Sequence, residues 1–219
     1  MNKLRMRFSK TGRAIYISHL DLMQTIQRAF NRAGYELAYS EGFNPHPIIS
    51  IALPLSVGAA SECELMDFRL REQTDLDQMP ERLTAAMPEG IVVSEVYEPS
   101  VKLSSIKWLR ISGTLEYDNA DTDLMAEKLT SFFQSERIEV EKKSKKGMLL
   151  TDIRPGIKEI LFTAGERAVY ADMILSAAEP TINPDLLIAA LRKDLPDFIP
   201  DFSKFLRLET YDSEMHLFR

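Results

Sequence analysis

The chain has 219 residues, of which 45% are hydrophobic and 27% charged, and its formal net charge is −6. These values are ordinary for a globular protein, and the length allows one large domain or two domains of roughly 100 residues each. The single cysteine excludes an internal disulfide framework, multi-cysteine zinc sites and a cluster held by several thiolates of this chain. Because no apolar run approaches the roughly 18 residues of a membrane span and the N-terminus lacks a signal-peptide core, we expect a cytoplasmic protein with no membrane association.

Charge is unevenly distributed along the chain. Residues 1–59 carry seven Lys or Arg against three Asp or Glu, whereas residues 60–100 carry three against ten. A basic first segment allows a local site for an anionic ligand despite the acidic total. The alternative is that solvated faces of the protein simply differ in sign.

The first half of the chain predicts the order strand, helix, strand, strand, helix, strand. Residues 3–8 alternate apolar and basic positions, which indicates a half-buried strand with a cationic face. Residues 18–34 are a predicted helix with Ser18 as its N-cap, Asp21 three residues later and Gly34 as its C-cap. The later elements are an apolar strand at 47–57, a strand at 62–70, an amphipathic helix at 74–87 and a strand at 90–98.

The second half repeats this order of elements after a seam near residues 98–105. The predicted elements are a strand at 106–117, a helix at 121–136, strands within 137–157 and 158–175, a helix that opens with Asn183 and Pro184, and a strand at 205–212. The sequence therefore predicts an α+β protein of two tandem ferredoxin-like (βαββαβ) units, residues 1–99 and 100–219. Each unit is expected to be an antiparallel sheet backed by two helices.

A first candidate site lies at the start of the helix predicted at 18–34. His19 stands in its first turn, where exposed backbone N–H groups favour an anion, and Tyr16 and Asp21 are close in sequence. A histidine there can act as a general base or donate a hydrogen bond to a phosphate oxygen. Alternatively, Asp21 caps the helix and His19 fills the first turn without any ligand.

A second candidate is the sequence GFNPHP at residues 42–47. Its prolines restrict the backbone and its glycine permits an unusual turn, so a stiff loop is expected. Phe43, Asn44 and His46 combine an aromatic ring, an amide and an imidazole, a mixture that suits stacking on a base and hydrogen bonding to its edge. The alternative is a connection shaped by proline whose Phe43 packs into the core.

Basic residues form a third group of candidates. Those near the N-terminus are Arg5, Arg7, Lys10 and Arg13. The later sequence KKSKKG at 142–147 predicts a hairpin tip that either contacts phosphates or keeps a sheet edge from pairing. Arg154 is a stronger candidate than this tip, because Pro155 and Gly156 constrain its backbone.

Metal and nucleotide sites find little support in the sequence. His19, His46 and His216 are scattered, without the spacing typical of metal ligands. The chain also contains no glycine-rich nucleotide-binding loop and no G-x-S-x-G nucleophile elbow. We therefore expect no metal and no cofactor.

The stretch from Tyr16 to Gly58, YISHLDLMQTIQRAFNRAGYELAYSEGFNPHPIISIALPLSVG, resembles the signature of the radical-SAM-linked family of bacterial proteins. DIRPGI at residues 152–157 is similar to a second, short motif of that family, and it adds Asp152 and Arg154 to the candidate residues. The resemblance covers most of the chain and implies a radical SAM protein as the partner, without implying a reaction. Gln24 and Asn31 depart from the family, in which cations are expected on this helix.

Three functions are compatible with these features. The first, which we favour, is an accessory module without catalytic activity that binds structured RNA (tRNA or rRNA) for a radical SAM protein. Its ligand-binding residues would be Arg13, His19, Asp21, Phe43, Asn44, His46, Asp152 and Arg154. The second is a metal-independent endoribonuclease that uses His19, Tyr16 and Arg13, by analogy with CRISPR repeat-processing enzymes of tandem ferredoxin-like fold. The third is a domain that docks the radical SAM partner without RNA, through the acidic segment 62–98.

Overall fold

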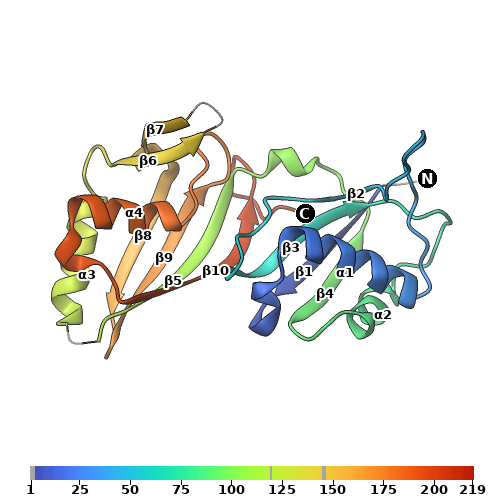
Figure 1. The fold of residues 1–219 in the computed structure, drawn as a ribbon, viewed down its shortest axis with the longest axis horizontal. Helices are drawn as coiled ribbons and strands as arrows, with labels where there is room; N and C mark the ends of the chain where they lie inside the picture. Colours follow the sequence, from blue (N-terminus) through green and yellow to red (C-terminus); the bar gives the residue numbers. More distant parts are fainter. Residues whose placement is uncertain (1–2, 119, 145–146) are drawn as a thin grey trace. The chain divides into compact units, whose positions relative to one another are not determined.

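The computed structural model describes residues 3–118, 120–144 and 147–219 (Figure 1). These residues form a mixed α+β structure with antiparallel strand pairing and four α-helices, which confirms the predicted α+β class. The chain divides into two compact units, residues 1–105 together with Arg219, and residues 106–218. Within the described ranges, every α-helix is too short or too polar to cross a membrane.

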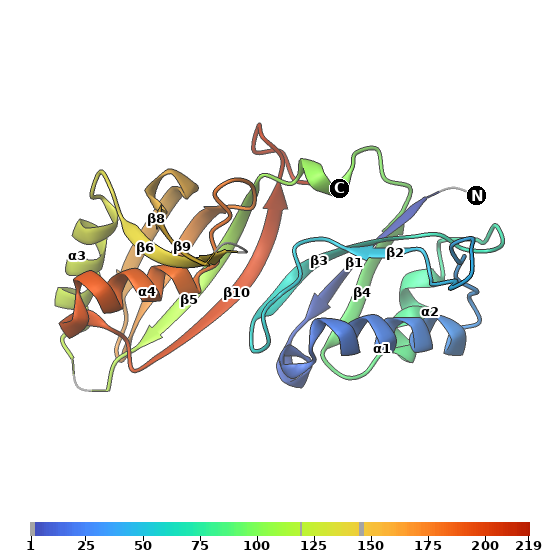
Figure 2. The same cartoon turned by 45° about the horizontal axis from the view of Figure 1, so that its top comes forward.

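The first unit has the element order predicted from the sequence. Its elements are β1 (Leu4–Lys10), the 3-10 helix η1 (Gly12–Tyr16), α1 (His19–Arg32), β2 (Ile49–Ile51), β3 (Ala60–Phe68), α2 (Met79–Ala86), β4 (Ile91–Tyr97) and the 3-10 helix η2 (Leu103–Ser105). The four strands pair antiparallel in the order β4-β1-β3-β2. α1 and α2 lie on the same face of this sheet (Figure 2).

Two elements of this unit are shorter than predicted. β2 is limited to three residues, since Leu53 after it has a positive φ of 44° and Pro54 has no N–H for a ladder hydrogen bond. α2 begins at Met79, where Pro80 occupies its first turn, so the preceding residues of the predicted helix remain outside it.

α1 begins and ends where its capping residues predict. Ser18 Oγ accepts from the backbone N–H of Asp21 at 3.2 Å and donates to Asp21 Oδ2 at 2.7 Å. Gly34, with φ of +79°, follows the C-cap Ala33 in the left-handed conformation that ends a helix. The position of His19 in the first turn is therefore determined by local sequence.

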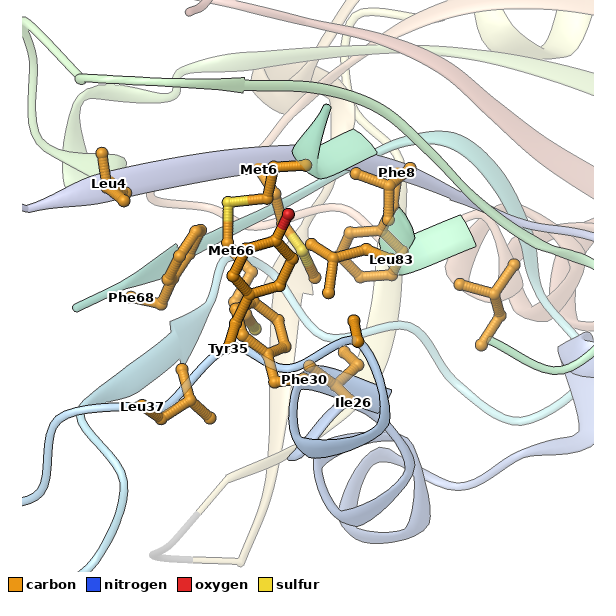
Figure 3. Packing of buried hydrophobic residues seen from close by; sticks show 14 of the residues in the cluster. Leu4, Met6, Phe8, Ile26, Phe30, Tyr35, Leu37, Met66, Phe68 and Leu83 are labelled. Carbon is orange, nitrogen blue, oxygen red and sulfur yellow. The ribbon is translucent and has the colours of Figure 1, made fainter. Parts of the chain in front are cut away.

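The core of the first unit lies between the sheet and its helices. Figure 3 shows side chains of β1 and β3 facing those of α1, and the labelled residues include Met6, Phe8, Met66, Phe68, Ile26 and Phe30. The rings of Phe30 and Phe68 meet edge to face with centroids 5.0 Å apart, a favoured aromatic geometry. This burial fixes α1 against β1 and β3.

The predicted cationic face of β1 is wrong, because Arg5 is completely buried. Its Nε donates to Asp67 Oδ1 at 2.6 Å, and its Nη2 donates to Asp67 Oδ2 at 3.2 Å and to the carbonyl of Val101 at 2.8 Å. Lys3 Nζ lies 2.5 Å from the same carboxylate. Arg5 thus serves the interior of the unit, where a buried charge requires a partner.

The second unit contains a four-stranded antiparallel sheet and a separate hairpin. Its elements are β5 (Trp108–Glu116), α3 (Thr122–Phe133), β6 (Glu139–Ser144), β7 (Gly147–Asp152), the 3-10 helix η3 (Arg154–Gly156), β8 (Ile157–Ala164), β9 (Ala168–Ser176), α4 (Asp185–Asp194), the 3-10 helix η4 (Pro196–Phe198) and β10 (Phe202–Tyr211). The sheet has the order β10-β5-β9-β8, and β6 pairs with β7. The predicted lysine-rich tip at 142–147 includes residues 145–146, which lie outside the described residues.

Candidate functional site

The residues predicted around the start of α1 differ in exposure. Arg13 and Tyr16 lie on η1, and both are exposed, with Tyr16 at 71%. His19 is half-buried, and Asp21 is exposed with its carboxylate engaged by Ser18. In the described part of the first unit, the side chains of Arg13, Tyr16 and His19 form no hydrogen bond with one another. These residues are neighbours in sequence that no such hydrogen bond joins into a catalytic cluster.

His19 lines a narrow pocket that also contains two buried charges. The pocket is lined by Lys10, Ile17, His19, Leu22, Ile51, Pro54, Leu55 and Glu64. The space of about 210 Å³ between them includes open solvent and leaves no room for an enclosed water molecule. Lys10 is 2% exposed and Glu64 is 1% exposed. The lining comes from the end of β1, the segment between η1 and α1, the start of α1, the end of β2 with the segment that follows it, and β3.

Pairing between β1 and β3 places the two charges in this pocket. Phe8 pairs with Glu64 and Lys10 pairs with Ser61, with an irregularity of register between Phe8 and Lys10. Lys10 Nζ donates to the carbonyl of Ile15 at 2.8 Å. Burial lowers the pKa of Lys10 below its ordinary value, and the negative charge of Glu64 opposes part of this effect. A perturbed lysine beside a carboxylate in a pocket marks a candidate functional site.

The loop that carries His46 is closed by Ser40. The backbone N–H of Ser40 donates to the carbonyl of His46 at 2.8 Å, the N–H of His46 donates to Ser40 Oγ at 3.1 Å, and Ser40 Oγ lies 2.9 Å from His46 Nδ1. Gly42 has φ of 118°, which favours glycine. Phe43 follows it with a relative exposure of 111%, and Asn44 and His46 are exposed too. The alternative in which Phe43 packs into the core is wrong, because the closed loop holds the ring in solvent.

The two candidate residues of the second unit, Asp152 and Arg154, form hydrogen bonds with its backbone. Asp152 Oδ1 accepts from the N–H groups of Ile138 and Arg154, both at 3.0 Å. Arg154 Nη1 donates to the carbonyl of Ile157 at 2.8 Å. These contacts explain both side chains as supports of the turn at η3, and their role in ligand binding stays a prediction.

The three histidines have separate surroundings. His19 lines the pocket, His46 belongs to the closed loop, and His216 Nδ1 lies 3.4 Å from Asp212 Oδ2. Among residues 3–118, 120–144 and 147–219, no three His, Cys, Asp or Glu side chains are grouped so that they could hold a metal ion.

Comparison with models of known protein families identifies the family of this chain. Residues 3–184 match the model of a family described as an uncharacterized protein conserved in bacteria, DUF2344. The chain belongs to this family. The DUF2344 match includes every candidate residue from Arg13 to Arg154, and it confirms the expectation of an uncharacterised bacterial family. The link of this DUF2344 chain to a radical SAM protein stays a prediction.

Other comparisons add no function. A search of curated proteins gives no match. A solved structure described as an unknown protein from Galdieria sulphuraria is similar over 94% of this chain and 98% of that chain, at 12% sequence identity and a TM-score of 0.28. At that score the likeness carries no argument about this chain.

Proposed function

We propose that this chain is an accessory module without catalytic activity of its own, which binds structured RNA (tRNA or rRNA) through its first unit for a radical SAM protein. The observation that carries the RNA part is the exposed ring of Phe43 on the loop closed by Ser40 and His46. A large apolar ring that stays exposed loses the stabilisation of about 1.5–3 kcal/mol that its burial would give. Stacking of a base on such a ring recovers about 1–3 kcal/mol.

The neighbouring groups suit the same ligand. Asn44 and His46 are exposed on the same loop, and their amide and imidazole groups can hydrogen-bond base edges. Arg13 on η1 is exposed and can contact phosphate. The radical SAM partner rests on the resemblance of residues 16–58 and 152–157 to the radical-SAM-linked family.

We also infer that each unit has the ferredoxin-like βαββαβ fold. Support comes from the strand orders β4-β1-β3-β2 and β10-β5-β9-β8, which are equivalent when the strands of each unit are numbered in turn without the β6–β7 hairpin. On this interpretation the hairpin is an insertion between α3 and β8 of the second unit.

A fluorescence-anisotropy titration of labelled tRNA and rRNA fragments at low and moderate salt tests the RNA proposal. Phe43→Ala should weaken binding about 5- to 150-fold, the range that corresponds to one stacked base. Phe202→Ala is the matched control, because Phe202 is an exposed phenylalanine (54%) of the second unit. This control should bind RNA as tightly as the wild type.

The outcomes separate the competing functions. If the wild type binds no RNA at low salt, or if both variants lose affinity equally, the RNA proposal is wrong.

Each RNA is also examined on a gel after the titration. Cut RNA would contradict a non-catalytic module and favour the endoribonuclease, for which His19→Ala should abolish cleavage and leave binding unchanged. Failure of a purified radical SAM protein from the same bacterium to bind the chain in a pull-down would contradict the proposed partnership.

A further inference from the structure

The loop that carries Phe43 and His46 stands beside an arginine that the sequence does not single out. Arg69 follows directly after β3, and its side chain is exposed. Its N–H donates to the carbonyl of Ile48 at 3.2 Å, and its carbonyl accepts from the N–H of Ala38 at 2.8 Å. The N–H of Ile48 in turn donates to the carbonyl of Ala38 at 2.8 Å, so these two residues close the base of the loop. Arg69 is therefore attached to both ends of the loop.

The register of the strands places the side chains of Arg69 and His46 on the same face. Ile49 pairs with Phe68, whose side chain is 1% exposed and lies in the core. One step along both strands, Arg69 stands opposite Ile48, and alternation turns this pair away from the core. His46 precedes Ile48 by two residues and so shares its face. Side chains in such diagonal positions are about 7–8 Å apart, a separation that a long arginine side chain can span.

Ser40 determines which ring nitrogen of His46 carries a proton. Ser40 Oγ accepts from the N–H of His46 at 3.1 Å, so its own hydrogen is available to Nδ1, which lies 2.9 Å away. The contact between Nδ1 and the carbonyl of Asn44, at 3.4 Å, is longer than a usual N–H···O hydrogen bond. Nδ1 therefore accepts from Ser40, and the proton of the ring lies on Nε2. His46 thus has an N–H donor on the side of the ring that Ser40 leaves open.

The guanidinium of Arg69 is available to a ligand. Arg71, two residues later, has its Nη1 3.2 Å from Glu36 Oε2, whereas in residues 3–118, 120–144 and 147–219 no carboxylate forms an ion pair with Arg69. A guanidinium has five N–H donors and no acceptor. Together with Nε2–H of His46, it gives this face of the loop a positive charge and donors only. The group that fits is an anion whose atoms only accept hydrogen bonds.

We propose that Arg69 and His46 together bind one phosphate group of the RNA strand whose base stacks on Phe43. The oxygens of a phosphate only accept hydrogen bonds, and arginine binds two of them at once. Phosphate contacts fix the position of a strand without reading its sequence, which suits a site whose other anchor is a stacked base. This inference rests on the proposed RNA binding. It assigns His46 to the backbone of the RNA, leaves the amide of Asn44 for the base edge, and adds one contact to those of the basic segment 1–59.

Arg69→Gln and its matched control Arg71→Gln test the phosphate contact in anisotropy titrations of the labelled tRNA and rRNA fragments. Both arginines are exposed and follow β3, and Arg71 already has Glu36 as its partner. Arg69→Gln should weaken RNA binding about 10-fold, the lower part of the range for hydrogen bonds to a charged group. It should also make the slope of log K against log salt concentration shallower by about 0.7. Arg71→Gln should change neither quantity, and circular dichroism checks that both variants are folded.

A double-mutant cycle tests whether both side chains bind the same phosphate. Arg69→Gln, His46→Gln and the double variant are compared with the wild type in the same titration. Because removal of one contact loosens the phosphate from the other, the double variant should lose less affinity than the product of the two single losses. Single losses that multiply would place the two side chains on different groups and overturn the shared site.

Titration with AMP and with adenosine separates this inference from the RNA proposal. Each is added to the full chain, and the ring signals of His46 are followed by NMR, assigned with His46→Gln. AMP should bind about 10-fold more tightly than adenosine, and Arg69→Gln should remove this difference. Equal affinity for AMP and adenosine, or RNA binding that Arg69→Gln leaves unchanged, overturns the phosphate site and leaves the proposed function standing. A preference for AMP without any RNA binding supports the site and contradicts the proposed RNA function.

Discussion

Two arginine–aspartate pairs of this chain share their geometry and differ in burial. Arg5 contacts Asp67 through Nε and Nη2 at 2.6 and 3.2 Å, and Arg110 contacts Asp172 through the same atoms at 3.0 and 2.7 Å. The side chains of the first pair are 0% and 5% exposed, whereas those of the second are both 47% exposed. The pairs therefore differ in burial, and Asp67 also holds a second cation, since Lys3 Nζ lies 2.5 Å from its carboxylate.

Asp67→Asn should lower the free energy of unfolding by about 3–5 kcal/mol, because it leaves the charge of Arg5 buried without its counter-ion. Asp172→Asn should lower it by less than about 1 kcal/mol, since water solvates both partners of the exposed pair. Urea denaturation of the wild type and the two variants measures both changes. Similar losses in the two variants would contradict this account of Arg5.

Individual site residues could be predicted only in part. The exposure of Phe43 and His46 follows from glycine and proline in a short segment, and the position of His19 follows from the cap at Ser18. The sequence marks Lys10 only as one of several basic residues and does not indicate Glu64, because the two meet only when β1 pairs with β3. A glutamate inside the apolar strand CELMDF was the available signal.

At the scale of elements, η1 is held by backbone contacts on two sides. The N–H of Thr11 donates to the carbonyl of Gly90 at 2.8 Å, and the N–H of Gly58 donates to the carbonyl of Ile15 at 2.9 Å. Both glycines have nearly the same φ, +90° and +91°. A Cβ at Gly90 would collide with the carbonyl of Thr11, whereas a Cβ at Gly58 would meet no atom within 4 Å.

Gly58→Ala should therefore cost only the backbone strain of a positive φ, about 1–2 kcal/mol of unfolding free energy. Gly90→Ala should cost about 1–3 kcal/mol more, because η1 must also move away from the added methyl group. Urea denaturation followed by circular dichroism compares the two variants. Equal losses of unfolding free energy in the two variants would mean that Thr11 can move away from the added methyl group without strain. Its contact with Gly90 would then not fix the position of η1.

The elements themselves were largely predictable, and their lengths were not. Alternation of apolar and polar residues and helix-capping residues are local signals. The order of strands and helices in the first unit therefore agrees with the order predicted from the sequence. The length of β2 depends on pairing with β3 and on prolines that cannot join the ladder. α4 begins at Asp185 with Pro184 as its N-cap, one residue later than the predicted N-cap Asn183, whose side-chain oxygen accepts from the N–H of Asp185 at 3.2 Å. Burial of Arg5 in β1 depends on contacts distant in sequence, with Asp67 and Val101.

At the scale of the whole molecule, an acidic chain must bind RNA through a local excess of positive charge. The net charge is −6, and the basic segment 1–59 contains seven Lys or Arg residues. Two of them, Arg5 and Lys10, are buried and are therefore not available to phosphates. At most five cations of this segment remain, which limits how many phosphates it can neutralise.

This limit predicts the salt dependence of RNA binding. Each phosphate neutralised on a single strand contributes about −0.7 to the slope of log K against log salt concentration, so five cations give a slope no steeper than about −3.5. Anisotropy titrations at four or more salt concentrations measure this slope, and Arg13→Gln should make it shallower by about 0.7. The matched control is Arg167→Gln, since Arg167 is an exposed arginine of the second unit. A slope much steeper than −3.5, or one that Arg167→Gln changes as much as Arg13→Gln, would place the phosphate contacts outside the basic segment.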